Sequence, residues 1–209
     1  MPAPLLYYIT DRSAFAGDEA ARRRAVIDRI VQAAKAGIEY IQLREKDLSG
    51  RDLEALARSA VEAILGSASK LLINSRTDIA LATLAHGVHL RDNDISPEQV
   101  RETWAHAELH SQPVIGISCH SAEQVCAAKD RVDFAVFAPI FEKKDARDVV
   151  PAGLEELRRA CRASVPVFAL GGIRLENWRE CLDAGAAGIA GIRLFQEGDL
   201  EATVRALRA

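Results

Sequence analysis

The segment PVIGISCHSAEQV, residues 113–125, joins a strand to a helix with almost no loop between them. The apolar run from Pro113 to Ile117 is typical of a strand buried on both faces, and a helical pattern begins at Ser121. Polar or reactive side chains occupy the junction, residues 118–121. Parallel α/β proteins place their chemistry at such junctions, so the segment predicts both a fold and a candidate site.

The same strand-then-helix unit recurs along the whole chain. Strict alternation of this kind requires a parallel sheet with right-handed crossovers. The expected strands cover residues 5–10, 38–44, 70–74, 87–90, 113–118, 133–139, 166–170 and 187–192. Eight units within 209 residues predict an α/β fold, a (β/α)8 TIM barrel forming one domain over residues 1–209. A doubly wound open sheet is the alternative.

Composition limits the classes of function. The 27 basic and 30 acidic residues give a net charge of −3, and no basic stripe suggests a nucleic-acid partner. No apolar run is long enough for a membrane span and no signal peptide is recognisable, so we expect a soluble, cytoplasmic protein. The four cysteines form no CxxC pair, which argues against structural zinc and disulfides. The sequence leaves open whether the chain forms a homo-oligomer.

The end of the second strand carries the charged segment QLREK, residues 42–46. Alternation along a strand puts Gln42 and Arg44 on one face and Leu43 and Glu45 on the other. If Gln42 and Arg44 face the barrel interior, a guanidinium lies at its mouth, where a pyrophosphate or carboxylate could dock. A solvated charged loop is the alternative.

Glycines follow the last two strands, in ALGGI and GIAGI. Barrel enzymes often bind phosphate between these loops, because glycine lets backbone N–H groups approach an anion. Gly171, Gly172 and Gly191 therefore predict a phosphate site, to which Arg193 adds a charge. The alternative is that the glycines only make tight turns.

Seven segments in order resemble the thiamine phosphate synthase and TenI superfamily. They are YYITDR, QLREK, INSRTDIA, GVHL, GIS-x-H, PVFALGGI and AGAAGIAGI, within residues 7–195. The resemblance implies a (β/α)8 barrel and one of two reactions on a thiazole phosphate. The synthase couples a hydroxymethylpyrimidine pyrophosphate to thiazole phosphate with Mg²⁺ and releases pyrophosphate. The TenI-type tautomerase moves a proton within a carboxythiazole phosphate and needs no metal cofactor.

The chain departs from the synthase pattern at the metal site. The synthase motif after the third strand is Asn-Asp, with the aspartate as a Mg²⁺ ligand, whereas this chain has Asn74-Ser75. Asp94 matches the second ligand, but Arg91 replaces a glycine beside it. Mg²⁺ is held by few protein ligands, so the loss of one carboxylate is serious. The sequence leaves open whether Asp92 substitutes for it.

The substrate contacts implied by the resemblance are only partly present. The Thr-x-Thr-Lys motif that holds the thiazole in synthases is absent after the sixth strand, where Lys143 or Lys144 is left to supply charge. Gln42, Arg44 and Lys46 match the synthase pyrophosphate clamp, and Asn74 keeps the asparagine of its motif. For a synthase the expected cofactor is Mg²⁺, bound by Asp94; for a tautomerase none is expected.

The histidine in SCHSAEQV resembles the acid/base of TenI-type enzymes. An imidazole titrates near neutral pH, which suits proton transfer at His120. Ser118 shares its face of the strand end and could address the same pocket. In the alternative, His120 only caps the following helix. His89 is a second candidate, for which a buried, hydrogen-bonded role is at least as plausible.

These observations predict an enzyme of thiamine biosynthesis acting on a thiazole phosphate, with tautomerisation by acid/base proton transfer placed first. Thiamine phosphate synthase activity is the first alternative. A catalytically silent regulator that binds a ligand of the pathway is the second.

Overall fold

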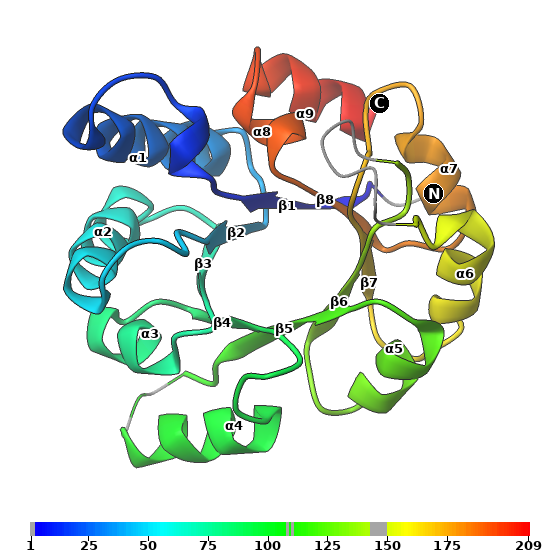
Figure 1. Ribbon diagram of the computed structural model, residues 1–209, viewed down its shortest axis with the longest axis horizontal. Helices are drawn as coiled ribbons and strands as arrows, with labels where there is room; N and C mark the ends of the chain where they lie inside the picture. Colours follow the sequence, from blue (N-terminus) through cyan, green and yellow to red (C-terminus); the bar gives the residue numbers. More distant parts are fainter. Residues whose placement is uncertain (1–2, 108, 110, 143–149) are drawn as a thin grey trace.

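The computed structural model is a closed barrel of eight parallel strands surrounded by helices (Figure 1). It describes residues 3–107, 109, 111–142 and 150–209. The strands pair in sequence order, and β8 pairs with β1 to close the sheet. The strands are β1 (Leu5–Ile9), β2 (Tyr40–Leu43), β3 (Lys70–Asn74), β4 (Gly87–Leu90), β5 (Val114–Cys119), β6 (Phe134–Phe137), β7 (Val167–Ala169) and β8 (Gly188–Gly191). The predicted (β/α)8 barrel is confirmed.

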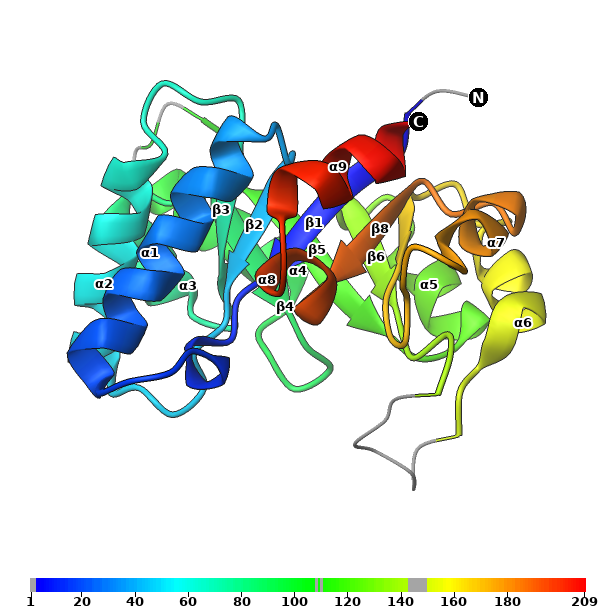
Figure 2. The ribbon, with the colours of Figure 1, turned by 90° about the horizontal axis from the view of Figure 1, so that it is seen from above.

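Helices cover the outside of the barrel and return the chain to the amino-terminal ends of the strands (Figures 1 and 2). They are η1 (Arg12–Ala14), α1 (Glu19–Lys35), α2 (Gly50–Ala63), α3 (Thr77–Thr83), α4 (Pro97–His106), α5 (Ala122–Ala128), α6 (Gly153–Ala160), α7 (Trp178–Asp183), α8 (Arg193–Gln196) and α9 (Leu200–Arg208). Helix α4 begins with a capping box in which Ser96 and Gln99 cap each other's backbone.

The segments after β7 and β8 each contain a short helix. Helix α7 covers only Trp178–Asp183, and the Asn177 side chain holds a turn just before it. Its Oδ1 accepts from the Arg174 backbone N–H at 2.8 Å and its Nδ2 donates to the Gly172 carbonyl at 3.1 Å. A short extra helix, α8, also follows β8 before the last helix begins.

The barrel interior is packed by aromatic rings near the amino-terminal ends of the strands. Tyr7 lies 5.2 Å from Phe134, which lies 5.0 Å from Phe168, between ring centroids. Gly116 makes room for this cluster, since a Cβ there would lie 2.6 Å from the Phe134 ring. A second core lies between the strands and the surrounding helices and includes Tyr8 and Cys119. The filled interior leaves the carboxyl ends of the strands for polar side chains.

Both the start of β1 and the end of α9 lie at the amino-terminal end of the barrel, away from the loops that follow the strands (Figure 2). Within the described residues, no helix has the length and apolarity that crossing a membrane requires.

Candidate functional site

Polar side chains from β2 to β5 meet at the carboxyl end of the barrel. The Gln42 amide, which is 1% exposed, donates to Asn74 Oδ1 at 3.0 Å. Asn74 is paired in register with His89 on β4, and His89 with Gly116 on β5. The structure therefore brings Gln42 and Asn74 together across neighbouring strands.

His89 is buried inside the barrel and links its aromatic core to the mouth. Its Nδ1 lies 3.1 Å from the Tyr7 hydroxyl and its Nε2 lies 2.9 Å from Ser118 Oγ. Burial, more than the charge of Arg44, lowers the pKa of His89 to about 3, so the ring is neutral near pH 7. The buried, hydrogen-bonded interpretation of His89 is confirmed. Ser118 faces inward and is partly exposed.

The His120 ring is exposed, and the loop after β6 orients it. Its Nδ1 lies 2.7 Å from the Ala138 carbonyl oxygen, so Nδ1 carries a proton and Nε2 is left as the base in the neutral ring. The cap of α5 is the Ser121 side chain, which accepts from the Gln124 backbone N–H. The His120 ring therefore does not cap α5. It does bond to backbone next to the start of that helix, so a structural role and the predicted acid/base role both stay open.

Just after β2, the Glu45 carboxylate is buried and has a structural role. Glu45 is buried, accepts from Thr10 Oγ1 at 2.6 Å, and forms a 3.3 Å ion pair with Arg12. Burial raises the pKa of Glu45 despite these bonds. Arg12 is itself buried and is bound most strongly by Asp47, at 2.6 Å. Arg12 and Glu45 thus fix the strand end rather than line the mouth.

Arg44 and Lys46 lie near Arg91 and form a cationic cluster with it. The charge of Arg44 is the main cause of a lowered pKa at Lys46, and Arg91 adds to it. Burial is the main cause of a lowered pKa at Arg44; the charges of Asp11 and Glu45 oppose this shift, and that of Arg91 adds to it. The repulsion between neighbouring positive charges decreases when an anion binds among them. We refer to Arg44, Lys46 and Arg91 as the cationic cluster.

Arg91, which stands where synthases have a glycine, bridges the ends of β3 and β4. Its Nε donates to Ser75 Oγ at 2.7 Å, and its Nη2 lies 3.3 Å from Asp94 Oδ1. The Arg91 backbone N–H donates to Asp94 Oδ2 at 2.7 Å. Asp92 is exposed in the same turn. Only the geometry of this turn reveals the bridge, so residue spacing gives no signal for it.

These residues do not fit Mg²⁺. Both Asp94 carboxylate oxygens are held by Arg91, and the Ser75 hydroxyl accepts from Arg91 and from Asn74 Nδ2. Mg²⁺ requires oxygen ligands in a nearly ideal octahedron, at ~2.1 Å. Within the part of the chain that the structure describes, no group of three or more His, Cys, Asp and Glu side chains is arranged to hold a metal.

The glycines after β7 are tightly packed against the loop after β6. Gly171 and Gly172 have φ of +102° and +68°, and a Cβ on either would lie within 2.8 Å of residues 139–142. Tight turning is therefore one reason for glycine at both positions. Gly191 is buried at the end of β8, and Arg193 is exposed at the start of α8. Lys143 and Lys144 lie outside the described residues.

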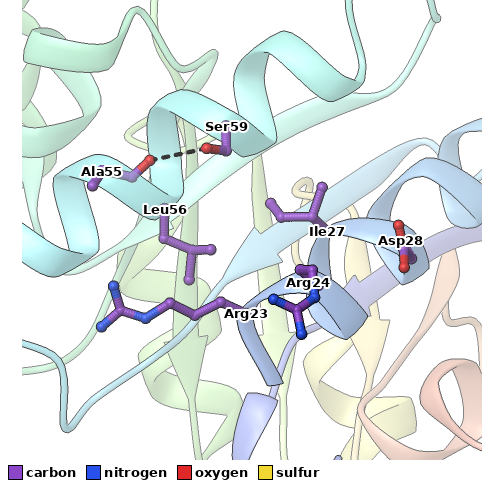
Figure 3. Close-up of a pocket in the computed structure, with 7 residues that line it drawn as sticks. All are labelled: Arg23, Arg24, Ile27, Asp28, Ala55, Leu56 and Ser59. Atoms are coloured by element: carbon purple, nitrogen blue, oxygen red, sulfur yellow. Dashed lines mark hydrogen bonds between the residues drawn. The ribbon is translucent and has the colours of Figure 1, made fainter. Parts of the chain in front are cut away.

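A hollow of about 370 Å³ lies elsewhere, between the outer faces of α1 and α2 (Figure 3). Arg23, Ile27 and Leu56 are among its lining residues, and the Arg23 guanidinium is already paired with Glu19 and Asp52. No strand end lines this hollow, so it is separate from the barrel mouth.

Comparison with known proteins matches residues 6–195 to the TMP-TENI family model, described as thiamine monophosphate synthase. The chain is 36% identical to a putative thiamine-phosphate synthase 2 of Aquifex aeolicus, over 94% of this chain and 100% of that protein. It is 38% identical to a putative thiamine-phosphate synthase of Geobacter sulfurreducens, over 98% of this chain and 92% of that protein.

The fold is also similar to that of a solved thiamine phosphate pyrophosphorylase from Pyrococcus furiosus. The TM-score is 0.80 at 28% identity, and the match covers 98% of this chain and 93% of that one.

Proposed function

Because this chain belongs to the thiamine monophosphate synthase (TMP-TENI) family of thiamine biosynthesis enzymes, we propose that it couples a hydroxymethylpyrimidine pyrophosphate to a thiazole phosphate. The proposal treats residues 1–209 as one domain acting in the cytoplasm. The observation that carries it is the polar network at the ends of β2 to β4, where Gln42 bonds to Asn74 and the Arg91 guanidinium is held by Ser75 and Asp94. The names of the relatives also favour coupling, which reverses the order of the sequence-based prediction, where tautomerisation comes first.

The proposed chemistry uses the cationic cluster to stabilise a leaving group. The bond between the pyrimidine methylene carbon and the pyrophosphate oxygen breaks, and the thiazole nitrogen forms a new bond to that carbon. Negative charge accumulates on the departing pyrophosphate. Arg44 and Arg91 would stabilise this charge. Arg91 is already held in place by Ser75 and Asp94, so it would lower the barrier without reorganising during the reaction.

The thiazole phosphate is proposed to bind at the loops after β7 and β8. The support is the position of these loops in the barrel and the exposed Arg193 at the start of α8. Replacing Gly172 would be a poor test, because its positive φ and its contacts with Phe141 make any side chain disruptive. Arg193→Gln is the sharper variant, and we expect it to weaken thiazole phosphate binding about tenfold or more.

Tautomerisation of a carboxythiazole phosphate is the second candidate. It is favoured by His120, whose Nδ1 is held by the Ala138 carbonyl so that Nε2 is available as a base. Ser118 would serve there as a hydrogen-bonding group, because it already bonds to His89.

A product assay on the purified protein tests the proposal. One reaction contains the pyrimidine pyrophosphate and thiazole phosphate, with and without Mg²⁺, and the other contains the carboxythiazole phosphate. We expect thiamine phosphate and pyrophosphate in equal amounts, and a large loss of both in Arg44→Gln but not in Arg58→Ala. Conversion of the carboxythiazole alone would favour the tautomerase. Binding of thiazole phosphate without either reaction would identify a silent, ligand-binding protein.

A further inference from the structure

Arg91 occupies the position between the two side chains that correspond to metal-ligand positions in synthases. Its guanidinium contacts Ser75 at 2.7 Å and Asp94 at 3.3 Å. The Asp94 side chain is 8% exposed, whereas that of Arg91 is 52% exposed. The carboxylate is therefore committed to holding the guanidinium, and the guanidinium still presents much of its surface to solvent.

The backbone around this bridge is organised to keep it in place. Ser75 has a φ of +62°, and its N–H donates to the His89 carbonyl at 2.9 Å. The Asp94 N–H donates to the Arg91 carbonyl at 3.1 Å, which closes the turn. Asn74 donates to the same Ser75 hydroxyl and accepts from Gln42. A continuous row of hydrogen bonds thus runs from Gln42 to Asp94.

The free part of the guanidinium suits a phosphate. Nε and Nη2 hold Ser75 and Asp94, and among the described residues no hydrogen bond or ion pair from Nη1 is found. Guanidinium is always charged, is planar and matches the oxygens of phosphate groups. A divalent cation at the same place would face the positive charges of Arg91, Arg44 and Lys46.

We propose that the Arg91 guanidinium, positioned by Ser75 and Asp94, takes the place of the divalent cation and contacts the substrate's pyrophosphate directly. This inference rests on the proposed function, because it assumes that pyrophosphate occupies the cationic cluster. Asp94 is then a positioning residue for Arg91 and not a metal ligand. Pyrophosphate binding by this protein accordingly needs no divalent metal.

Calorimetric titration of the full chain with inorganic pyrophosphate in EDTA tests this directly. We expect binding without metal, and a loss of affinity of about 10- to 100-fold in Arg91→Ala, the range for hydrogen bonds between charged groups. Arg91→Lys keeps the charge but loses the planar donor pair. Its affinity for pyrophosphate should therefore lie between those of the wild type and Arg91→Ala. Arg58→Ala is the matched control, since Arg58 is similarly exposed and pairs with Glu54 on the outer surface.

A second experiment adds Mn²⁺ alone to the protein and measures its binding by electron paramagnetic resonance. We expect no binding to the wild type at this site, and binding to the double variant Ser75→Asp/Arg91→Gly, in which the carboxylate is restored and the guanidinium removed. Tight Mn²⁺ binding by the wild type that is lost in Asp94→Asn would overturn the inference. So would an Arg91→Lys variant, folded by circular dichroism, that binds pyrophosphate as tightly in EDTA as the wild type.

The outcomes separate this inference from the proposed function. A protein that binds pyrophosphate through Arg91 without metal, yet forms no thiamine phosphate, contradicts only the proposed function. A protein that forms thiamine phosphate strictly with Mg²⁺, and whose pyrophosphate affinity is independent of Arg91, contradicts only the inference.

Discussion

At the scale of single residues, His120 distinguishes the two candidate reactions. Its ring is anchored through Nδ1 to Ala138, and α5 is capped by Ser121. The His120→Asn variant should therefore keep the fold. If this chain tautomerises a carboxythiazole phosphate, the variant should lose about 10²–10⁴-fold in rate, the usual contribution of a general acid or base. The pH–rate profile of the variant should also lack one ionisation that the profile of the wild type shows.

The same variant has a defined outcome for the alternative role. Reduced thermal stability with unchanged turnover per folded molecule would show that His120 is structural. Ser121→Ala is the matched control, because it removes the actual cap and should lower stability without changing proton transfer.

His89 gives a residue-scale prediction about acid. The pKa of His89 in the folded protein is about 3, below its ordinary value of 6.5. Between pH 6.5 and pH 3, the unfolded chain therefore binds a proton at His89 that the folded protein does not bind. This contribution to stability is fully present above pH 6.5 and is lost as the pH falls toward 3. Between pH 6 and 4, the free energy of unfolding of the wild type should fall relative to His89→Gln by about 1.4 kcal/mol per pH unit.

Urea unfolding of the two proteins at a series of pH values measures this difference. Parallel stability curves from pH 6 to 4 would mean that His89 is already able to take up a proton in the folded barrel. Such a result would contradict its burial between Tyr7 and Ser118.

At the scale of elements, the capping box of α4 can be tested by itself. Ser96→Ala removes the side-chain oxygen that accepts from the Gln99 N–H, and should cost about 1 kcal/mol of unfolding free energy. Ser59→Ala within α2 is the control, because alanine favours a helix interior and only a 3.3 Å bond to Ala55 is lost. Equal denaturation midpoints for Ser96→Ala and the wild type would exclude a stabilising cap.

The elements were largely predictable from the sequence, because strand and helix periodicities are local. The strand expected over residues 133–139 is found at Phe134–Phe137, and the helix expected from Ser121 begins at Ala122. The short α8 was not predictable, since four residues contain too little periodicity to mark a helix.

The site was only partly predictable, because its decisive contacts join different elements. Strand alternation is enough to separate Gln42 and Arg44 from Glu45. The burial of Arg12 depends on Glu45, Asp47 and Glu19 converging from separate segments. The bridge made by Arg91 depends on the turn that brings Asp94 back toward its own backbone.

At the scale of the whole molecule, barrel closure depends on how the interior is filled. Gly116 faces the Phe134 ring and His89, and a Cβ there would lie 2.6 Å and 2.9 Å from them. Gly116→Ala should therefore destabilise the protein by about 1–3 kcal/mol, as expected for an overpacked core. Chemical denaturation measures the change. An unchanged stability would mean that the interior rings can move aside without loss.

The central claim is that the barrel mouth holds two anions, pyrophosphate at the cationic cluster and thiazole phosphate at the loops after β7 and β8. The most direct measurement is a crystal structure of the protein soaked with both compounds in EDTA. We expect one diphosphate density against Arg44, Lys46 and Arg91, and one phosphate density between Gly191 and Arg193. Both anions at the β7 and β8 loops, or neither at the cationic cluster, would contradict the account.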